Sequence, residues 1–142
     1  MTRNPGLIDN SAINTGCFTV SNSIAKTSLS LCHLVREVRE ARPDLDMVAS
    51  LVNSLDTVLD LLKDDAAEFP SYLAQMTPAV LDKCHYIVNE LEGCLAVLGR
   101  SDIPRAEKQS RWLAGRDHVE KLRGTLEGYR ATLALAVDLM AM

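Results

Sequence analysis

The sequence predicts an all-α protein, namely a four-helix bundle with a long N-terminal helix and short helical connectors. Apolar residues make up 47% of the 142 residues, whereas aromatic residues make up only 4%. A core built from Leu, Val, Ile and Ala suits helices better than a sheet. Apolar residues also recur every three or four positions, which is the helical period. A chain of this length fits one domain, so we expect residues 1–142 to form a single bundle.

The first expected helix spans residues 8–41. Asp9, Asn10 or Ser11 can cap its start, and Arg42-Pro43 ends it because the residue before proline avoids the helical region. One stripe of apolar or small residues runs along it: Ile13, Cys17, Val20, Ile24, Thr27 or Ser28, Leu31, Val35 and Val38. A second row has small hydroxyl side chains four residues apart: Ser11, Thr15, Thr19, Ser23 and Thr27.

Proline and glycine mark the boundaries of the next two helices. The second helix is expected over 44–63, where Pro43 suits the first turn and Asp44 lies near the positive end of the helix dipole. Phe69-Pro70 opens a connector with one short helical turn. Thr77-Pro78 is typical of a helix start, with a hydroxyl cap before proline, and Gly99 is a natural stop. The third helix is therefore expected over 78–98.

The last helix is expected over 116–140, following a polar, basic connector at 101–114 that contains the only tryptophan, Trp112. Bases outnumber acids between Arg100 and Arg130, although the whole chain carries a net charge of −4. The acidic balance argues against nucleic acid as a partner, since a basic face is the usual footprint. The local basic excess predicts either a solvated surface or a partner surface, formed by Arg105, Lys108, Arg111, Trp112 and Arg116. The alternative role for Trp112 is a lid over one end of the core.

Nothing in the sequence predicts a catalytic, cofactor or metal site. The four cysteines, Cys17, Cys32, Cys84 and Cys94, fall on apolar helical stripes, so we expect buried free thiols in a reducing compartment. Cys32-His33 and Cys84-His85 do not chelate a metal through one face, because adjacent helical residues point about 100° apart. Phosphate-binding, metalloprotease and hydrolase motifs are absent from the sequence. We therefore expect a non-enzymatic protein.

The first helix allows two interpretations. Its hydroxyl row and the small residues Ala12, Gly16, Ser21 and Ala25 are compatible with a close-packing membrane face, or with a helix buried among three others. The sequence contains neither a secretory signal nor an uncharged apolar run of about 18 residues. We therefore expect a cytoplasmic protein with no constitutive membrane span.

Several stretches together resemble the fungal HeLo-like amino-terminal domains found in front of NLR-like STAND proteins and ankyrin-repeat proteins. The same family is also labelled after a protein of an azaphilone pigment cluster. The resemblance covers most of the chain, and its motifs are patterns rather than catalytic signatures. The matching stretches are the nearly uncharged first helix, the turn at 38–43, the segments 51–62 and 80–98, Arg111-Trp112-Leu113, and 122–133.

This resemblance implies a bundle akin to HeLo and to the executioner bundle of necroptosis. In that group the N-terminal helix is released to permeabilise membranes once a receptor or an amyloid-like partner gathers several copies. It also implies recruitment to the plasma membrane on activation, with an anionic membrane surface as a partner. Asn10, Asn14 and Asn22 make this first helix more polar than the pattern. The implied effector positions are Leu7, Ile8, Ala12, Ile13, Gly16, Phe18 and Val20.

Three functions follow as hypotheses. The first is a non-enzymatic signalling or cell-death effector of a fungal NLR-like system. The second is a protein-interaction or oligomerisation module without membrane activity. The third is an accessory protein or unusual enzyme of fungal secondary metabolism, with a small-molecule pocket in the bundle core.

Overall fold

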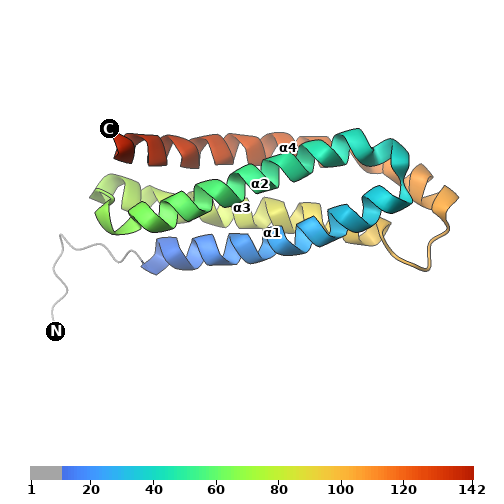
Figure 1. The fold of residues 1–142 in the computed structure, drawn as a ribbon, viewed down its shortest axis with the longest axis horizontal. Coiled ribbons are helices and arrows are strands. Elements are labelled where there is room, and N and C mark those ends of the chain that lie inside the picture. The colour runs from blue at the N-terminus through green and yellow to red at the C-terminus, as the bar shows by residue number, and fades with distance from the viewer. Residues whose placement is uncertain (1–10) are drawn as a thin grey trace.

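The fold, taken from a computed structural model that describes residues 11–142, is an all-α bundle of four long helices (Figure 1). The long helices are α1 (Ser11–Glu37), α2 (Arg42–Asp65), α3 (Ser71–Leu98) and α4 (Arg105–Ala141). Two 3₁₀ turns, η1 (Arg39–Ala41) and η2 (Ala66–Glu68), lie in the connections. This confirms the predicted four-helix bundle with a long N-terminal helix and helical connectors.

The four helices form a ring in which α1 and α4 occupy opposite corners (Figure 1). α1 packs chiefly on α3 and α2, and α4 packs chiefly on the same two helices. The start of α1, the end of α2, the start of α3 and the end of α4 gather at one end of the bundle. α1 and α3 are therefore parallel neighbours, while α2 and α3, which follow each other in the chain, lie across the ring.

The predicted apolar stripes fill the centre. In α2, the fully buried stripe includes Val52, Leu55, Leu59 and Leu62, and α3 contributes Leu81, Cys84, Val88, Leu91 and Leu95. These positions recur at three- and four-residue steps, so one face of each helix is removed from water. The observed bounds of α2 lie within two residues of the predicted 44–63 at each end.

Two predicted helix starts are wrong. α3 begins at Ser71, directly after Pro70, and passes through Pro78. The Thr77 hydroxyl, expected as a cap, instead donates to the Leu73 carbonyl oxygen at 2.6 Å inside the helix. Burial of Ala74 holds this first turn against the core and outweighs the local start signal at Thr77-Pro78.

α4 begins at Arg105, eleven residues before the predicted start at 116. Pro104 precedes it in an extended conformation, and Lys108, Trp112 and Val119 then form one buried stripe. The segment expected as a polar connector is thus mostly helix. At the other boundary, α1 ends at Glu37 rather than near Ala41, because Val38 is extended before η1. The predicted start of the first helix at residue 8 lies outside the described residues.

Candidate effector helix and partner surface

The inner face of α1 is an ordinary core stripe. Ile13, Cys17 and Val20 have no exposed surface, and Ile24 and Leu31 are 4% exposed. Two of the implied effector positions, Ile13 and Val20, are therefore inaccessible in this packed state. Any action that uses them on a partner requires α1 to leave its place in the bundle.

The remaining implied effector positions have different surroundings. Ala12 is exposed, and Phe18 has 64% of its surface exposed. Gly16 is half-buried and lies close to Leu81 on α3. Leu7 and Ile8 lie outside the described residues. The five described positions thus do not lie on one face of α1.

Gly16 allows α1 to pack tightly against α3. A Cβ atom added there would lie 2.9 Å from Leu81 Cδ1 and 3.2 Å from Leu81 Cβ. Real Cβ atoms do not approach neighbouring carbon atoms as closely as 2.9 Å, so a larger side chain requires the Leu81 side chain or one of the two helices to shift. The small residue at this position is a packing requirement of the closed bundle.

The hydroxyl row of α1 turns gradually from solvent into the interface. Residues four apart on a helix drift by about 40° per step, so Thr15 is exposed whereas Ser23 and Thr27 are buried. Thr27 Oγ1 donates to the Ser23 carbonyl oxygen at 2.9 Å, and Ser23 Oγ donates to Asn89 Oδ1 on α3 at 3.0 Å. The buried hydroxyls are therefore satisfied within the bundle.

Two further serines of α1 bind acidic side chains on its two neighbours. Ser21 donates to Asp56 on α2, and Ser30 Oγ donates to Glu92 Oε1 on α3 at 3.3 Å. Between Ser11 and Ala25 the helix has no charged residue on any face. The α1 interface is therefore made of apolar stripe residues flanked by neutral donors.

Only some residues of the predicted partner surface are exposed. Lys108 and Trp112 are each 1% exposed, so they are not available to a partner in the packed bundle, and the prediction is wrong for these two. Trp112 instead packs in the core, in agreement with the alternative role as a lid. Arg105, Arg111 and Arg116 are exposed. Lys108 lies on the buried side of α4 because it precedes Trp112 by four residues, one helical turn.

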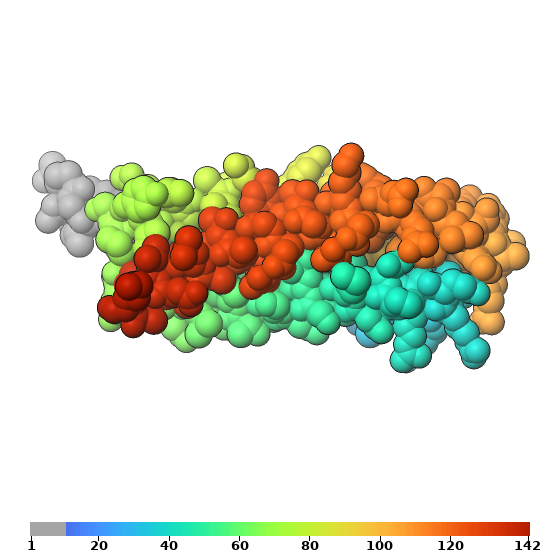
Figure 2. Space-filling view, turned by 90° about the horizontal axis from the view of Figure 1, so that it is seen from above, coloured from blue at the N-terminus to red at the C-terminus, as the bar shows by residue number. Residues whose placement is uncertain are grey.

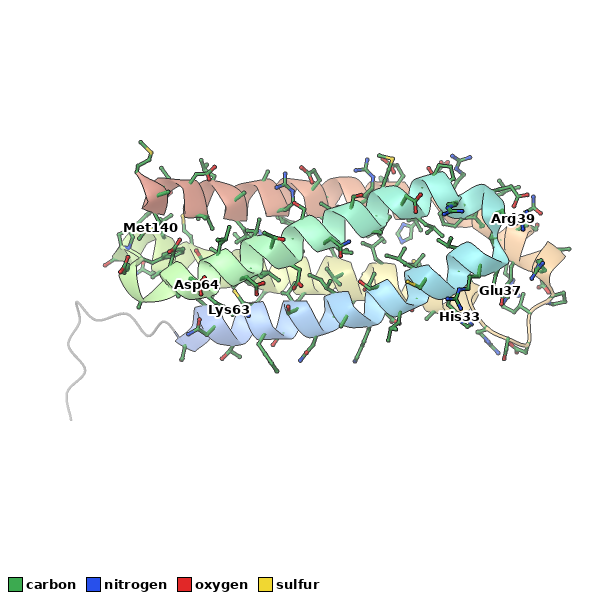
Figure 3. All side chains as sticks on the ribbon, in the orientation of Figure 1. His33, Glu37, Arg39, Lys63, Asp64 and Met140 are labelled. Carbon is green, nitrogen blue, oxygen red and sulfur yellow. The ribbon has the colours of Figure 1, made fainter. Side chains whose placement is uncertain are left out.

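Lys108 joins the start of α4 to the end of α1. Its Nζ lies 3.2 Å from Glu37 Oε2, and the Glu37 side chain is 31% exposed. Glu37 and His33 lie on the last turns of α1, at the end of the bundle where α4 begins (Figure 3). The hydrogen bond from Lys108 lowers the pKa of the Glu37 carboxyl. This pair was missed in the sequence, because a lysine in a basic segment gives no signal that it is buried.

Two of these three exposed arginines, Arg111 and Arg116, have nearby acidic partners. Arg111 binds Glu107 at 2.9 Å within α4, and Arg116 binds Asp44 on α2 at 3.2 Å. Along the α2–α4 side, Arg123 binds Glu120 and Arg130 binds Glu127, and these bonds lower the pKa of both glutamates. The local basic excess is therefore largely paired with acids within the bundle.

The cysteines do not share one environment. Burial raises the pKa of the Cys17 thiol to about 11 and that of Cys84 to about 12, and it raises the pKa of the half-buried Cys94. Cys32 is exposed, so the prediction of four buried thiols is wrong at this position. Cys32 is one residue after the buried Leu31, and adjacent residues on a helix point about 100° apart, so Cys32 lies off the buried stripe of α1. Among residues 11–142, no group of three or more His, Cys, Asp or Glu side chains is arranged to hold a metal ion.

Sequence reasoning also missed an apolar groove between the start of α3 and the end of α4. Its lining includes four large exposed side chains: Tyr72, Met76, Leu135 and Leu139. Figure 2 looks onto α4, with the first turns of α3 along one side and α2 along the other. The signal for it was weak, because Leu135 and Leu139 share their segment with the core residues Leu133 and Ala136.

Comparisons with known proteins found no matching family model, no matching curated protein and no matching solved structure. Within residues 11–142, no helix has the length and apolar character needed to cross a membrane.

Proposed function

We propose that this chain is a non-enzymatic signalling bundle of the HeLo-like type, in which α1 is the effector segment. The observation that carries the proposal is the absence of charge on α1 from Ser11 to Ala25, on its outward as well as its buried face. Surface helices normally present charged residues to water. A helix without them can move to a less polar environment at a lower desolvation cost.

The contacts of α1 suit a helix that is held but can be released. Its outward face presents Phe18, and its interface includes neutral hydroxyls that bond to Asp56 on α2 and to Asn89 and Glu92 on α3. Thr19 and Thr27 donate to carbonyl oxygens of their own helix, so these hydroxyls keep their partners wherever α1 goes. In the proposed action, gathering several copies favours the released state, and the stripe at Ile13 and Val20 then contacts lipid or another copy. The proposed location is the cytoplasm, with recruitment to the anionic plasma membrane on activation.

The test is dye leakage from vesicles with and without anionic lipid. Gly16→Val should loosen α1 from Leu81 and increase leakage above that of the unmodified chain. Adding Phe18→Asp should abolish this leakage, whereas adding Tyr86→Asp should not. Tyr86 on α3 is a matched control, because Phe18 and Tyr86 are both 64% exposed.

Circular dichroism of each variant checks that the bundle remains helical. Absence of leakage from both the unmodified chain and Gly16→Val, in either lipid, would reject the membrane action. Equal loss with Phe18→Asp and Tyr86→Asp would show that α1 has no special role. A protein-interaction module without membrane activity would then be the better proposal, and the apolar surface of α4 favours that second function.

A further inference from the structure

Within residues 11–142, no other helix covers the outward face of α4. Leu126 and Leu133 point into the core, and the opposite side of the helix contains five exposed residues in one stripe: Gly124, Gly128, Ala131, Leu135 and Leu139. Their spacings of four, three, four and four residues keep them on one face. From Gly124 to Leu135 this stripe is uncharged. It continues into the groove formed with Tyr72 and Met76 on α3.

The two glycines are not required by the packing of the bundle. A Cβ added at Gly124 or Gly128 meets no atom within 4 Å. Glycine inside a helix is less favourable than alanine by about 0.5–1 kcal/mol. If another helix packs on this face from outside, the absence of side chains at both glycines lets its backbone come close.

The stripe is complementary to itself when reversed. Its first half is small, with Gly124 and Gly128, and its second half is large, with Leu135 and Leu139. If a second α4 lies antiparallel over the first, with the two-fold axis between Ala131 and Thr132, each leucine meets a glycine of the other copy. Leu135 then faces Gly128, and Leu139 faces Gly124. We propose that two copies of this chain associate in this way, through the outward faces of α4.

Charge favours the same arrangement. In this register, exposed Lys121 of one copy lies beside the last turn of α4 in the other, where Ala141 ends the helix. The last four carbonyl groups of a helix have no partner within the helix, and they give its end a partial negative charge. Lys121 has no ion pair within residues 11–142. Two lysines, one from each copy, therefore complement the two helix ends.

The expected dimer is weak. The contact involves one helix from each copy, extended by Tyr72 and Met76 along the groove. Interfaces of this kind fall toward the small class, below about 1,200 Å² in total, which is typical of transient complexes. The monomer–dimer balance should therefore follow protein concentration. This inference does not require α1 to act on membranes.

The first test is sedimentation of the full chain over a range of concentrations. The unmodified chain should shift reversibly from monomer to dimer. Leu135→Asp should weaken association at least about tenfold, because the new carboxylate has to be desolvated at the contact. Leu113→Asp is the matched control on α4: Leu113 is 55% exposed and Leu135 58%, but position 113 lies outside the proposed overlap.

A second variant separates association from folding. Gly128→Leu should leave the monomer at least as stable as before, because the site is open, but it should block the approach of Leu135 from the other copy. The register is tested by mixing Leu135→Cys chains with Gly128→Cys chains, both with Cys32→Ser. Oxidation should link unlike chains in preference to like chains.

A chain that remains monomeric at all concentrations would overturn the inference, as would equal association of Gly128→Leu or equal loss with Leu113→Asp. Preferential linkage of Leu135→Cys chains to each other would overturn the antiparallel register. Phe18→Asp should dimerise normally. Normal dimerisation without leakage would reject the membrane action but keep this interface. Leakage without dimerisation would reject this interface but keep the membrane action.

Discussion

α1 and α4 lie at opposite corners of the bundle and use different kinds of packing. α1 approaches α3 closely through Gly16, and its buried face combines the small side chains of Cys17, Ser23 and Thr27 with larger ones such as Ile13 and Leu34. α4 differs in burying Trp112, which is larger than any buried side chain of α1. The comparison indicates that α1 should be sensitive to added volume and α4 to removed volume. Added volume at Gly16 and removed volume at Trp112 therefore test the two helices separately.

The largest expected effect is at the anchor of α4. Trp112→Ala removes the largest fully buried side chain and leaves a cavity at the end of the core. We expect the free energy of unfolding to fall by about 3–5 kcal/mol, measured by urea denaturation. The neighbouring Leu113→Ala is the control. Leu113 is exposed, so its loss should change stability by no more than about 0.5 kcal/mol. Similar losses for both variants would mean that Trp112 is not an anchor.

The sequence was sufficient for the fold class and for the core, but not for every boundary. The apolar stripe of α2 is regular and its first turn contains Pro43, so local and tertiary preferences agree there. At Thr77-Pro78 they disagree. The local motif is a helix start, but Ala74 is buried one turn earlier and extends α3 to Ser71. A single sequence cannot show which preference prevails, because the decision lies in contacts with other helices.

The surface residues were harder to predict than the core. Lys108 and Trp112 were expected together on a basic partner surface, because no helical period was recognised in 101–114. Their four-residue spacing, followed by Val119, was the available signal, but a lysine within an apolar stripe obscures it. Leu135 and Leu139 are misleading in the opposite direction. Leucines are usually core residues, and their exposure is seen only once the packing of α4 on its neighbours is known. The sequence therefore indicates which residues are apolar but not which side of α4 is unpartnered.

The second largest effect is expected in α1, at Gly16. Gly16→Val adds volume where Leu81 already lies in close contact, and we expect a loss of about 1–3 kcal/mol in unfolding free energy. Gly93→Val on α3 is the control, because an added Cβ there meets nothing within 4 Å. It should change stability by no more than about 0.5 kcal/mol. Hydrogen exchange should show the loss from Gly16→Val first in α1, and uniform loss across all four helices would contradict a helix that is released separately.

The smallest expected effect is at the contact between the two helices, the pair formed by Glu37 at the end of α1 and buried Lys108 near the start of α4. Glu37→Gln keeps the shape of the side chain but leaves Lys108 without an anionic partner, so the variant should be less stable at pH 7. The effect is smaller than the first two because Glu37 is 31% exposed and solvent screens the pair. Glu37→Gln combined with Lys108→Met should recover stability, since an apolar side chain needs no partner there.

The direction of the Glu37 pKa shift determines how the stability difference between the unmodified chain and Glu37→Gln changes with pH. The hydrogen bond and the charge of Lys108 lower the pKa of Glu37 in the folded chain below its ordinary value in an unfolded chain. The stabilisation is therefore complete above that unfolded value, and it is lost as the pH falls through the folded pKa. Urea denaturation at several pH values should show the difference between the unmodified chain and Glu37→Gln narrowing toward acid. Asp102→Asn removes a carboxylate whose pKa is also lowered, by Arg100, but both partners are exposed, so it should have little effect. A constant difference across the pH range would mean that Glu37 stabilises the bundle by packing alone, and acid would then not weaken the contact between α1 and α4.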